Sequence, residues 1–150
     1  MLRQCVECCP DDLWLAGEHP RNFWRIAYHA AFYTHFYMGQ NLDVFEPWSK
    51  HRDSCTNLWA DEGEVIEVLE PYTKSEVLEY IDLVDSKVDS IIDGLDLDAG
   101  ETGFWWYDKS KKMNKLDHEI MTIRHVQGHM GQLSEILMAH GIDVDWVAIR

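Results

Sequence analysis

The stretch TKSEVLEYIDLVDSKVDSII, residues 73–92, decides the fold class. Thr73 and Glu76 have the spacing of a capping box, in which two side chains satisfy each other's backbone amides where a helix begins. Alternating spacings of four and three, typical of a helix packed in a bundle, then relate the apolar residues Val77, Ile81, Val84, Val88 and Ile91. Gly94 is a natural terminator. We expect a solvated opposite face at Glu79, Asp82, Asp85, Asp89 and Asp93.

Two further long helices are predicted around this one. The first runs from Pro20 to Met38, ends before Gly39 and is apolar nearly all round, so we expect it in the centre of the core. The second runs from Lys115 to His140, with Asn114 as its N-cap and Gly141 as its C-cap residue.

The remaining segments complete the predicted architecture. A short helix from Leu2 to about Cys9 precedes Pro10, and long connections cover residues 39–71 and 95–114. No β-type alternation or internal repeat interrupts this pattern. The sequence therefore predicts one all-α domain, residues 1–150, folded as an up-down antiparallel four-helix bundle with a short first helix.

The charge balance excludes several classes of partner. The 150 residues include 13 basic and 27 acidic ones, a net charge of −14, which disfavours binding to nucleic acids or anionic membranes. The first ten residues lack a signal-peptide pattern, and no stretch is apolar enough for a membrane span. We therefore expect a cytoplasmic protein. In that compartment the cluster of Cys5, Cys8 and Cys9 is more typical of small half-buried thiols than of a redox or zinc site, since Cys55 stands alone.

His125 and His129 form the most suggestive polar pair. Four residues apart on a helix, their side chains are about 40° and about 6 Å apart, so both imidazoles can reach one metal ion. Val126 stands where a His-Glu-x-x-His protease would have its glutamate, so that class is excluded.

The other histidines are more ambiguous. His29 shares a helix stripe with apolar residues, and its spacing alone favours a hydrogen-bonded core histidine while leaving a ligand role open. His35 lies about 120° away from it. We expect His118 at the surface beside two acidic residues, and His140 at the helix end. His19 and His51 lie in connections without a partner at ligand spacing.

A family resemblance joins these residues. The stretches FWRIAYH (23–29) with Phe32 and Tyr33, IRHVQGHMGQL (123–133), PYTK (71–74) and the closing residues 141–146 together resemble the DinB-like superfamily of metal-binding four-helix bundles. The resemblance implies that His29, His125 and His129 bind a divalent ion, zinc or nickel, and that the chain forms a homodimer. Gly128, where relatives often carry histidine, and the short first helix are departures from the family pattern.

The implied site supports several functions. Three neutral imidazoles would leave a coordination position for a water, whose pKa falls towards about 7, or for a thiol, which would be deprotonated. The first outcome gives a hydrolase and the second a low-molecular-weight thiol S-transferase, each with a small-molecule substrate. Gln132, Thr122 and Tyr33 are candidates to orient the ligands. The alternatives are a non-catalytic metal-binding bundle closed by an extra ligand, and a helical interaction module using the aromatic run 104–107, although such a run more commonly plugs a bundle end.

Overall fold

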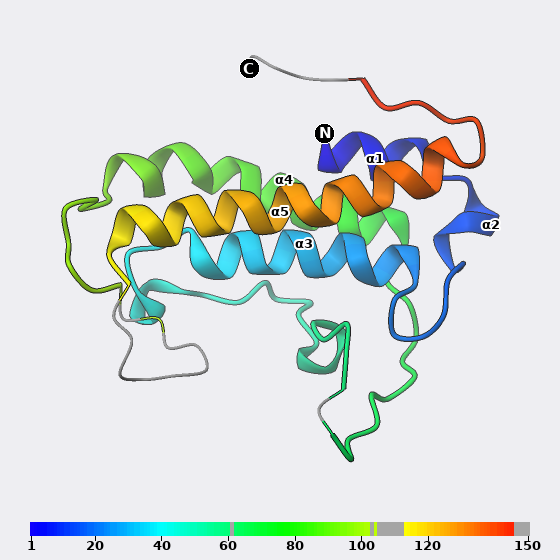
Figure 1. Ribbon diagram of the computed structural model, residues 1–150, viewed down its shortest axis with the longest axis horizontal. Helices are drawn as coiled ribbons and strands as arrows, with labels where there is room; N and C mark the ends of the chain where they lie inside the picture. Colours follow the sequence, from blue (N-terminus) through cyan, green and yellow to red (C-terminus); the bar gives the residue numbers. More distant parts are fainter. Residues whose placement is uncertain (61, 103, 105–112, 146–150) are drawn as a thin grey trace.

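A computed structural model describes residues 1–150 except 61, 103, 105–112 and 146–150. Its described residues form helices and connections without a strand. The elements are α1 (Leu2–Cys8), α2 (Asp11–Trp14), α3 (Phe23–Tyr37), α4 (Lys74–Asp93), α5 (Lys115–Met138) and the 3-10 turns η1 (Leu42–Val44) and η2 (Asp53–Cys55). The prediction of an all-α helical bundle is confirmed (Figure 1). No described helix is long and apolar enough to cross a membrane.

Helix α4 follows its sequence pattern closely. The capping box forms, with the Thr73 backbone amide donating to Glu76 Oε2 at 2.8 Å and the Glu76 amide donating to Thr73 Oγ1 at 3.2 Å. Of the predicted apolar seam, Val77 and Val84 are buried and the other members are half-buried against the core. The five acidic residues of the opposite face are exposed.

Helix α3 is the central element, as its composition predicts, because twelve of its fifteen residues are buried. It begins at Phe23 rather than Pro20, with Asn22 as its N-cap. Gly39 follows its C-terminal end at a place where a Cβ atom would lie 2.8 Å from Val44 Cγ2. A side chain at position 39 would therefore require the exposed side chain of Val44 to shift.

Helix α5 begins as expected, with Asn114 Oδ1 accepting from the Asp117 amide at 2.8 Å. It ends at Met138, two residues before His140. Gly141 has a φ of +75°, and the amide of the next residue, Ile142, donates to the Leu137 carbonyl at 3.0 Å. This left-handed turn favours glycine because it carries no Cβ penalty there.

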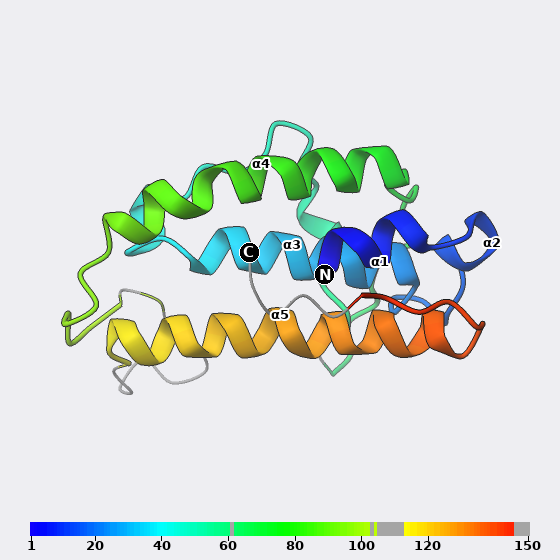
Figure 2. The ribbon, with the colours of Figure 1, turned by 90° about the horizontal axis from the view of Figure 1, so that it is seen from above.

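The helix directions differ from strict up-down alternation. Figures 1 and 2 show α3 and α4 running in the same direction, with α5 opposite to both. The contacts agree: Trp24 pairs with Tyr72 near the two helix starts at 6.2 Å between ring centroids, and His35 and Lys87 line one small cavity near the ends. Residues 38–60 and 62–73 run back along the bundle, which allows two successive long helices to be parallel.

The N-terminal pieces close one side of the bundle. Helix α1 packs on α3, α4 and α5 through Cys5 and Val6, which have no exposed surface. Helix α2, which the sequence pattern did not predict, places Trp14 so that its Nε1 donates to the Tyr72 carbonyl at 2.8 Å. All four cysteines are free, and burial raises the pKa of the Cys9 thiol to about 11. The cysteine cluster therefore has no activated thiolate at Cys9.

Candidate metal centre

The antiparallel packing of α3 on α5 brings together the three histidines that the family resemblance implies as ligands. Nε2 of His125 lies 3.1 Å from Nε2 of His29 and 3.1 Å from Nε2 of His129. Candidate ligand atoms of these three residues all lie within 4.8 Å of one another. A tetrahedral zinc ion with bonds of about 2.0–2.1 Å needs ligand atoms about 3.3 Å apart, so the spacing suits a metal ion.

Hydrogen bonds at the opposite ring nitrogens orient two of the three imidazoles. Nδ1 of His29 donates to the Thr56 carbonyl at 2.5 Å, since a carbonyl oxygen can only accept. Nδ1 of His129 lies 2.9 Å from Oε1 of Gln132, which is likewise an acceptor. Both Nε2 atoms are therefore left with lone pairs that point towards His125. Nδ1 of His125 is buried with no hydrogen-bond partner among the described residues.

This arrangement favours a cation at its centre. With lone pairs on Nε2 of His29 and His129, a neutral His125 could donate from its own Nε2 to at most one of them. The lone pair on the other Nε2 would then have no hydrogen-bond donor. A divalent ion accepts all three lone pairs at once, so the donor set, which is three neutral nitrogens, fits zinc or a similar transition metal.

The environment keeps these imidazoles neutral. Burial lowers the pKa of His29 to about 3, against a smaller opposing effect of its hydrogen bond to Thr56 and with further lowering by His129, His125 and Arg21. Burial and the neighbouring His129 lower the pKa of His125 to about 4. Burial also lowers the pKa of His129, although its bond to Gln132 opposes this. Because histidine binds metals in its neutral form, no proton has to leave these rings near pH 7.

The side chains around the three imidazoles are mainly aromatic. The ring of Tyr33 lies 4.6 Å from that of His29 and 5.5 Å from that of His125, measured between centroids. Trp59 meets His29 edge-on at 6.0 Å. The charge of Arg21, an exposed residue, contributes to the lowered pKa of both His29 and His129. Because the three imidazoles are neutral, they would leave the charge of a divalent ion intact.

The residues predicted to orient the ligands have different outcomes. Gln132 contacts Nδ1 of His129 as described above, which is the contact that a residue orienting this imidazole would make. Tyr33 packs against two of the rings. The hydroxyl of Thr122 instead donates to the His118 carbonyl at 3.0 Å within its own helix. Sequence reasoning missed Thr56 and Trp59, because a backbone carbonyl leaves no residue signature and the connection has no periodicity.

The prediction that His118 lies at the surface is wrong. Its side chain has no exposed surface, stacks on Phe104 at 4.4 Å between ring centroids and has Nδ1 3.3 Å from Nζ of Lys115. The reason is helix register: His118 precedes Thr122 by four residues and His125 by seven, so all three share the face that packs on α3. Of its acidic neighbours in sequence, Asp117 pairs with Asn114 at the helix start, while Glu119 pairs with Lys115 and also lies 3.7 Å from Nδ1 of His118.

The other histidines are not part of the centre. Nδ1 of His35 lies 3.0 Å from the Tyr80 hydroxyl, so His35 is a core residue. His51 lies between the Tyr28 hydroxyl, 2.6 Å from its Nδ1, and Asp53 Oδ1, 2.8 Å from its Nε2. His19 and His140 each contact a backbone carbonyl through one ring nitrogen. These contacts account for the remaining imidazoles without a metal ion.

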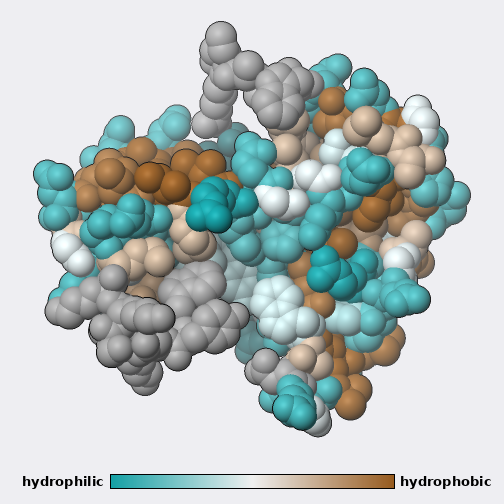
Figure 3. Space-filling view, viewed as in Figure 1, coloured by the Kyte–Doolittle hydropathy of each residue, from teal (hydrophilic) through white to brown (hydrophobic). Residues whose placement is uncertain are grey.

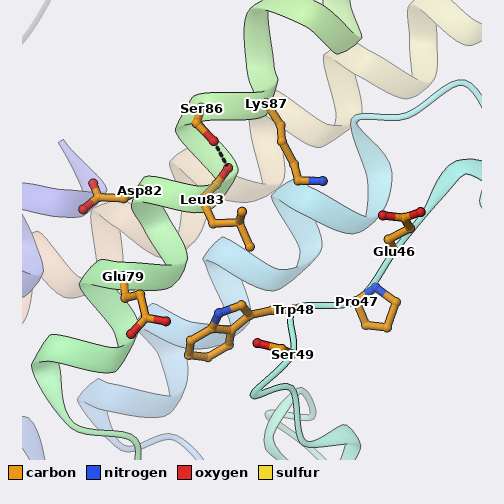
Figure 4. Close-up of a pocket in the computed structure, with 9 residues that line it drawn as sticks. All are labelled: Glu46, Pro47, Trp48, Ser49, Glu79, Asp82, Leu83, Ser86 and Lys87. Atoms are coloured by element: carbon orange, nitrogen blue, oxygen red, sulfur yellow. Dashed lines mark hydrogen bonds between the residues drawn. The ribbon is translucent and has the colours of Figure 1, made fainter.

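A separate groove of about 540 Å³ lies between α4 and residues 46–49 (Figure 4). Its lining includes Trp48 and the carboxylates of Glu79 and Asp82, which pair with Lys50 and Arg3 respectively. It shares no residue with the three-histidine group. Because two of its carboxylates are already paired with cations, it is a weaker candidate for metal binding than the histidine centre.

Of the aromatic run 104–107, the structure describes Phe104, which is buried. Residues 105–107 and the closing Trp146 of the resemblance lie outside the described residues.

Comparisons of the chain with models of protein families, with curated proteins and with solved structures found no match. What can be stated is therefore the class that fold and site define, an all-α helical bundle with a three-histidine group that could hold a metal ion.

Proposed function

We propose that this chain is a metal-dependent enzyme related to the DinB-like bundles, which holds zinc or nickel at His29, His125 and His129 and acts on a small molecule. The observation that carries the proposal is the convergence of three Nε2 atoms, with the His125 atom 3.1 Å from each of the other two. When bound, a divalent ion supplies Lewis-acid chemistry, lowering the pKa of a water or a thiol at a further coordination position.

The residues of this chain would contribute in distinct ways. Thr56 and Gln132 fix the rings of His29 and His129 with Nε2 directed inwards, which preorganises the ligands. Burial keeps the imidazoles neutral. Because the ligands carry no negative charge, the full charge of the ion would act on the reacting group. Both reactions considered for the site, hydrolysis and thiol S-transfer, use that electrophilic effect.

A non-catalytic site is less well supported. Storage or sensing would favour a centre closed by a fourth protein ligand, whereas the group formed by the described residues has three members. An interaction module would need no convergent histidines at all. The three-ligand geometry therefore supports catalysis better than either alternative.

The homodimer implied by the resemblance is part of this proposal. Leu116, Ile120 and Ile123 follow one face of α5 and are 49%, 48% and 60% exposed. Figure 3 shows hydrophobic side chains gathered over this part of α5. Sedimentation velocity of the wild type and of Ile123→Lys tests the role of this face: we expect a dimer that the substitution weakens, and a wild-type monomer would contradict it.

The test of the proposed enzyme combines metal analysis with two reaction screens. Protein reconstituted with zinc or nickel should hold about one ion per chain. Loaded protein is then screened for conjugation of low-molecular-weight thiols to electrophiles and for hydrolysis of esters and amides, with His129→Ala as the inactive control. Activity that requires the ion in one screen supports the proposal. Substoichiometric metal after reconstitution, or equal activity in His129→Ala, would contradict it.

A further inference from the structure

Trp59 is an exposed aromatic residue held beside the proposed metal centre. Its side chain is 55% exposed, and its ring lies 6.0 Å from that of His29. Most other large aromatic side chains of the described residues are buried or half-buried. Because ligand pockets are lined mainly by hydrophobic and aromatic side chains, an aromatic ring next to a ligand cluster is placed where it can form the wall of such a pocket.

The position of Trp59 is fixed by the segment that precedes it. Leu58 and Cys55 are almost completely buried, and Arg25 donates to the Ser54 carbonyl. The Thr56 carbonyl accepts from His29, so the metal-ligand residue itself anchors this segment. Exposure of Trp59 therefore does not result from a loose chain end. The ring is preorganised at a defined distance from His29, and binding to it would cost little ordering entropy.

A second aromatic ring adjoins the same imidazole from another element. Tyr33, one turn after His29 on α3, lies 4.6 Å from the His29 ring and is half-buried. Figure 3 shows that the molecular face near the middle of α3 is hollowed. The two rings offer apolar surface to a molecule whose donor atom reaches the centre formed by the three Nε2 atoms.

We propose that Trp59 is a specificity-determining residue, which packs against a flat apolar or aromatic group of a small-molecule thiol bound at the three-histidine centre. This inference rests on the proposed function, because it takes the donor atom of the substrate to be a ligand of the ion. It selects the chemical class of substrate: a thiol that carries an aromatic or planar apolar group is preferred over a small hydrophilic thiol. Aromatic pairs contribute enough to change affinity about tenfold.

The experiment uses protein reconstituted with Co²⁺, whose visible absorption reports directly on its ligands. Benzyl mercaptan and 2-mercaptoethanol are titrated separately into the wild type, Trp59→Ala and Trp59→Phe, after elemental analysis of each protein. We expect Trp59→Ala to bind benzyl mercaptan about tenfold more weakly and 2-mercaptoethanol unchanged, whereas Trp59→Phe retains most of the preference. The Co²⁺ content should be the same in all three proteins.

The outcomes separate this inference from the function on which it rests. If Co²⁺ binds and both thiols change its spectrum, but Trp59→Ala weakens both equally or neither, the inference about Trp59 is wrong. If the wild type retains no Co²⁺, or if neither thiol changes its spectrum, the proposed thiol chemistry itself fails. A selective loss for benzyl mercaptan, restored in Trp59→Phe, supports both.

Discussion

Two clusters of buried and half-buried polar side chains lie along the same pair of helices, α3 and α5. The first is the candidate metal centre, where Nε2 of His125 lies 3.1 Å from Nε2 of His29 and of His129, and the three rings contact no carboxylate in the described structure. The second lies nearer the start of α5, where Nζ of Lys115 is 2.6 Å from Oε1 of Glu119 and also donates to the Gly39 carbonyl. His118 is buried in this second cluster, with its Nε2 unpartnered among the described residues.

The comparison shows that burial of a histidine on α5 does not by itself make it a ligand. His118 and His125 share a helix face and differ in what lies opposite. Across from His125, α3 presents His29, whereas across from His118 it presents Tyr37, with Phe104 stacked nearby. The first cluster lacks a protein counter-charge and suits an external cation, while the second contains its own ion pair.

The largest effect expected concerns metal binding. His29→Ala, His125→Ala and His129→Ala should each abolish stoichiometric binding, because two imidazoles are too few to hold the ion tightly. His118→Ala, the matched control on the same face of α5, should retain about one ion per chain. Elemental analysis after reconstitution measures this directly. Full metal content in all three ligand variants would show that the ion binds elsewhere.

The next effect concerns folding stability in the second cluster. Lys115→Met should lower the free energy of unfolding by about 3 kcal/mol, because it leaves Glu119 without its partner in a mostly buried position. Urea denaturation of the metal-free protein measures the change. The double variant Lys115→Met, Glu119→Leu should recover much of the loss. The metal content of Lys115→Met should be normal, and a loss of metal would mean that the two clusters are coupled.

A third buried histidine, His35, gives a pH dependence without a metal. Burial, with a smaller contribution from the charge of Lys87, lowers the pKa of His35 to about 4 in the folded protein, where its Nδ1 contacts the Tyr80 hydroxyl. As the pH falls from 7 to 5, the unfolded chain gains a proton on this ring that the folded chain does not. The free energy of unfolding should therefore fall by about 2 kcal/mol from this group, and the loss should level off below pH 4.

The measurement for His35 is the urea midpoint of the wild type and of His35→Gln between pH 7 and pH 4. Both proteins contain the same metal-site histidines, so the difference in their pH dependence isolates position 35. We expect a flatter profile for His35→Gln. Parallel profiles would mean that His35 has an ordinary pKa in the folded protein.

The smallest effect expected is on metal affinity. Gln132→Ala removes the acceptor from Nδ1 of His129 and should weaken metal binding about tenfold, without changing the stoichiometry. Thr122→Ala is the control, since its hydroxyl contacts the His118 carbonyl and no imidazole. Competition with a chelator of known affinity measures both variants. Equal metal affinities of the two variants would show that Gln132 does not support metal binding.

Features of the fold and the site could be predicted from the sequence where interactions between neighbouring residues determine them. The capping box of Thr73 and Glu76, the glycine after α5 and the spacing of His125 and His129 are properties of neighbouring residues, so the sequence predicted them. The depth of His118 and the parallel course of α3 and α4 depend on how distant elements pack. The acidic neighbours of His118 wrongly suggested a surface position, and the assumption of alternating helices wrongly suggested that α3 and α4 are antiparallel.

The sequence by itself determined the three long helices, because capping, apolar periodicity and glycine termination act within a few residues along the chain. It also determined that two imidazoles on α5 could reach one ion, since the helix repeat fixes their separation. Only the tertiary structure decided that His29 on α3 meets them, that the Thr56 carbonyl sets its tautomer, and that Trp59 lies beside it in solvent. These contacts join residues 27 to 100 positions apart, and long-range packing rather than local propensity fixes them.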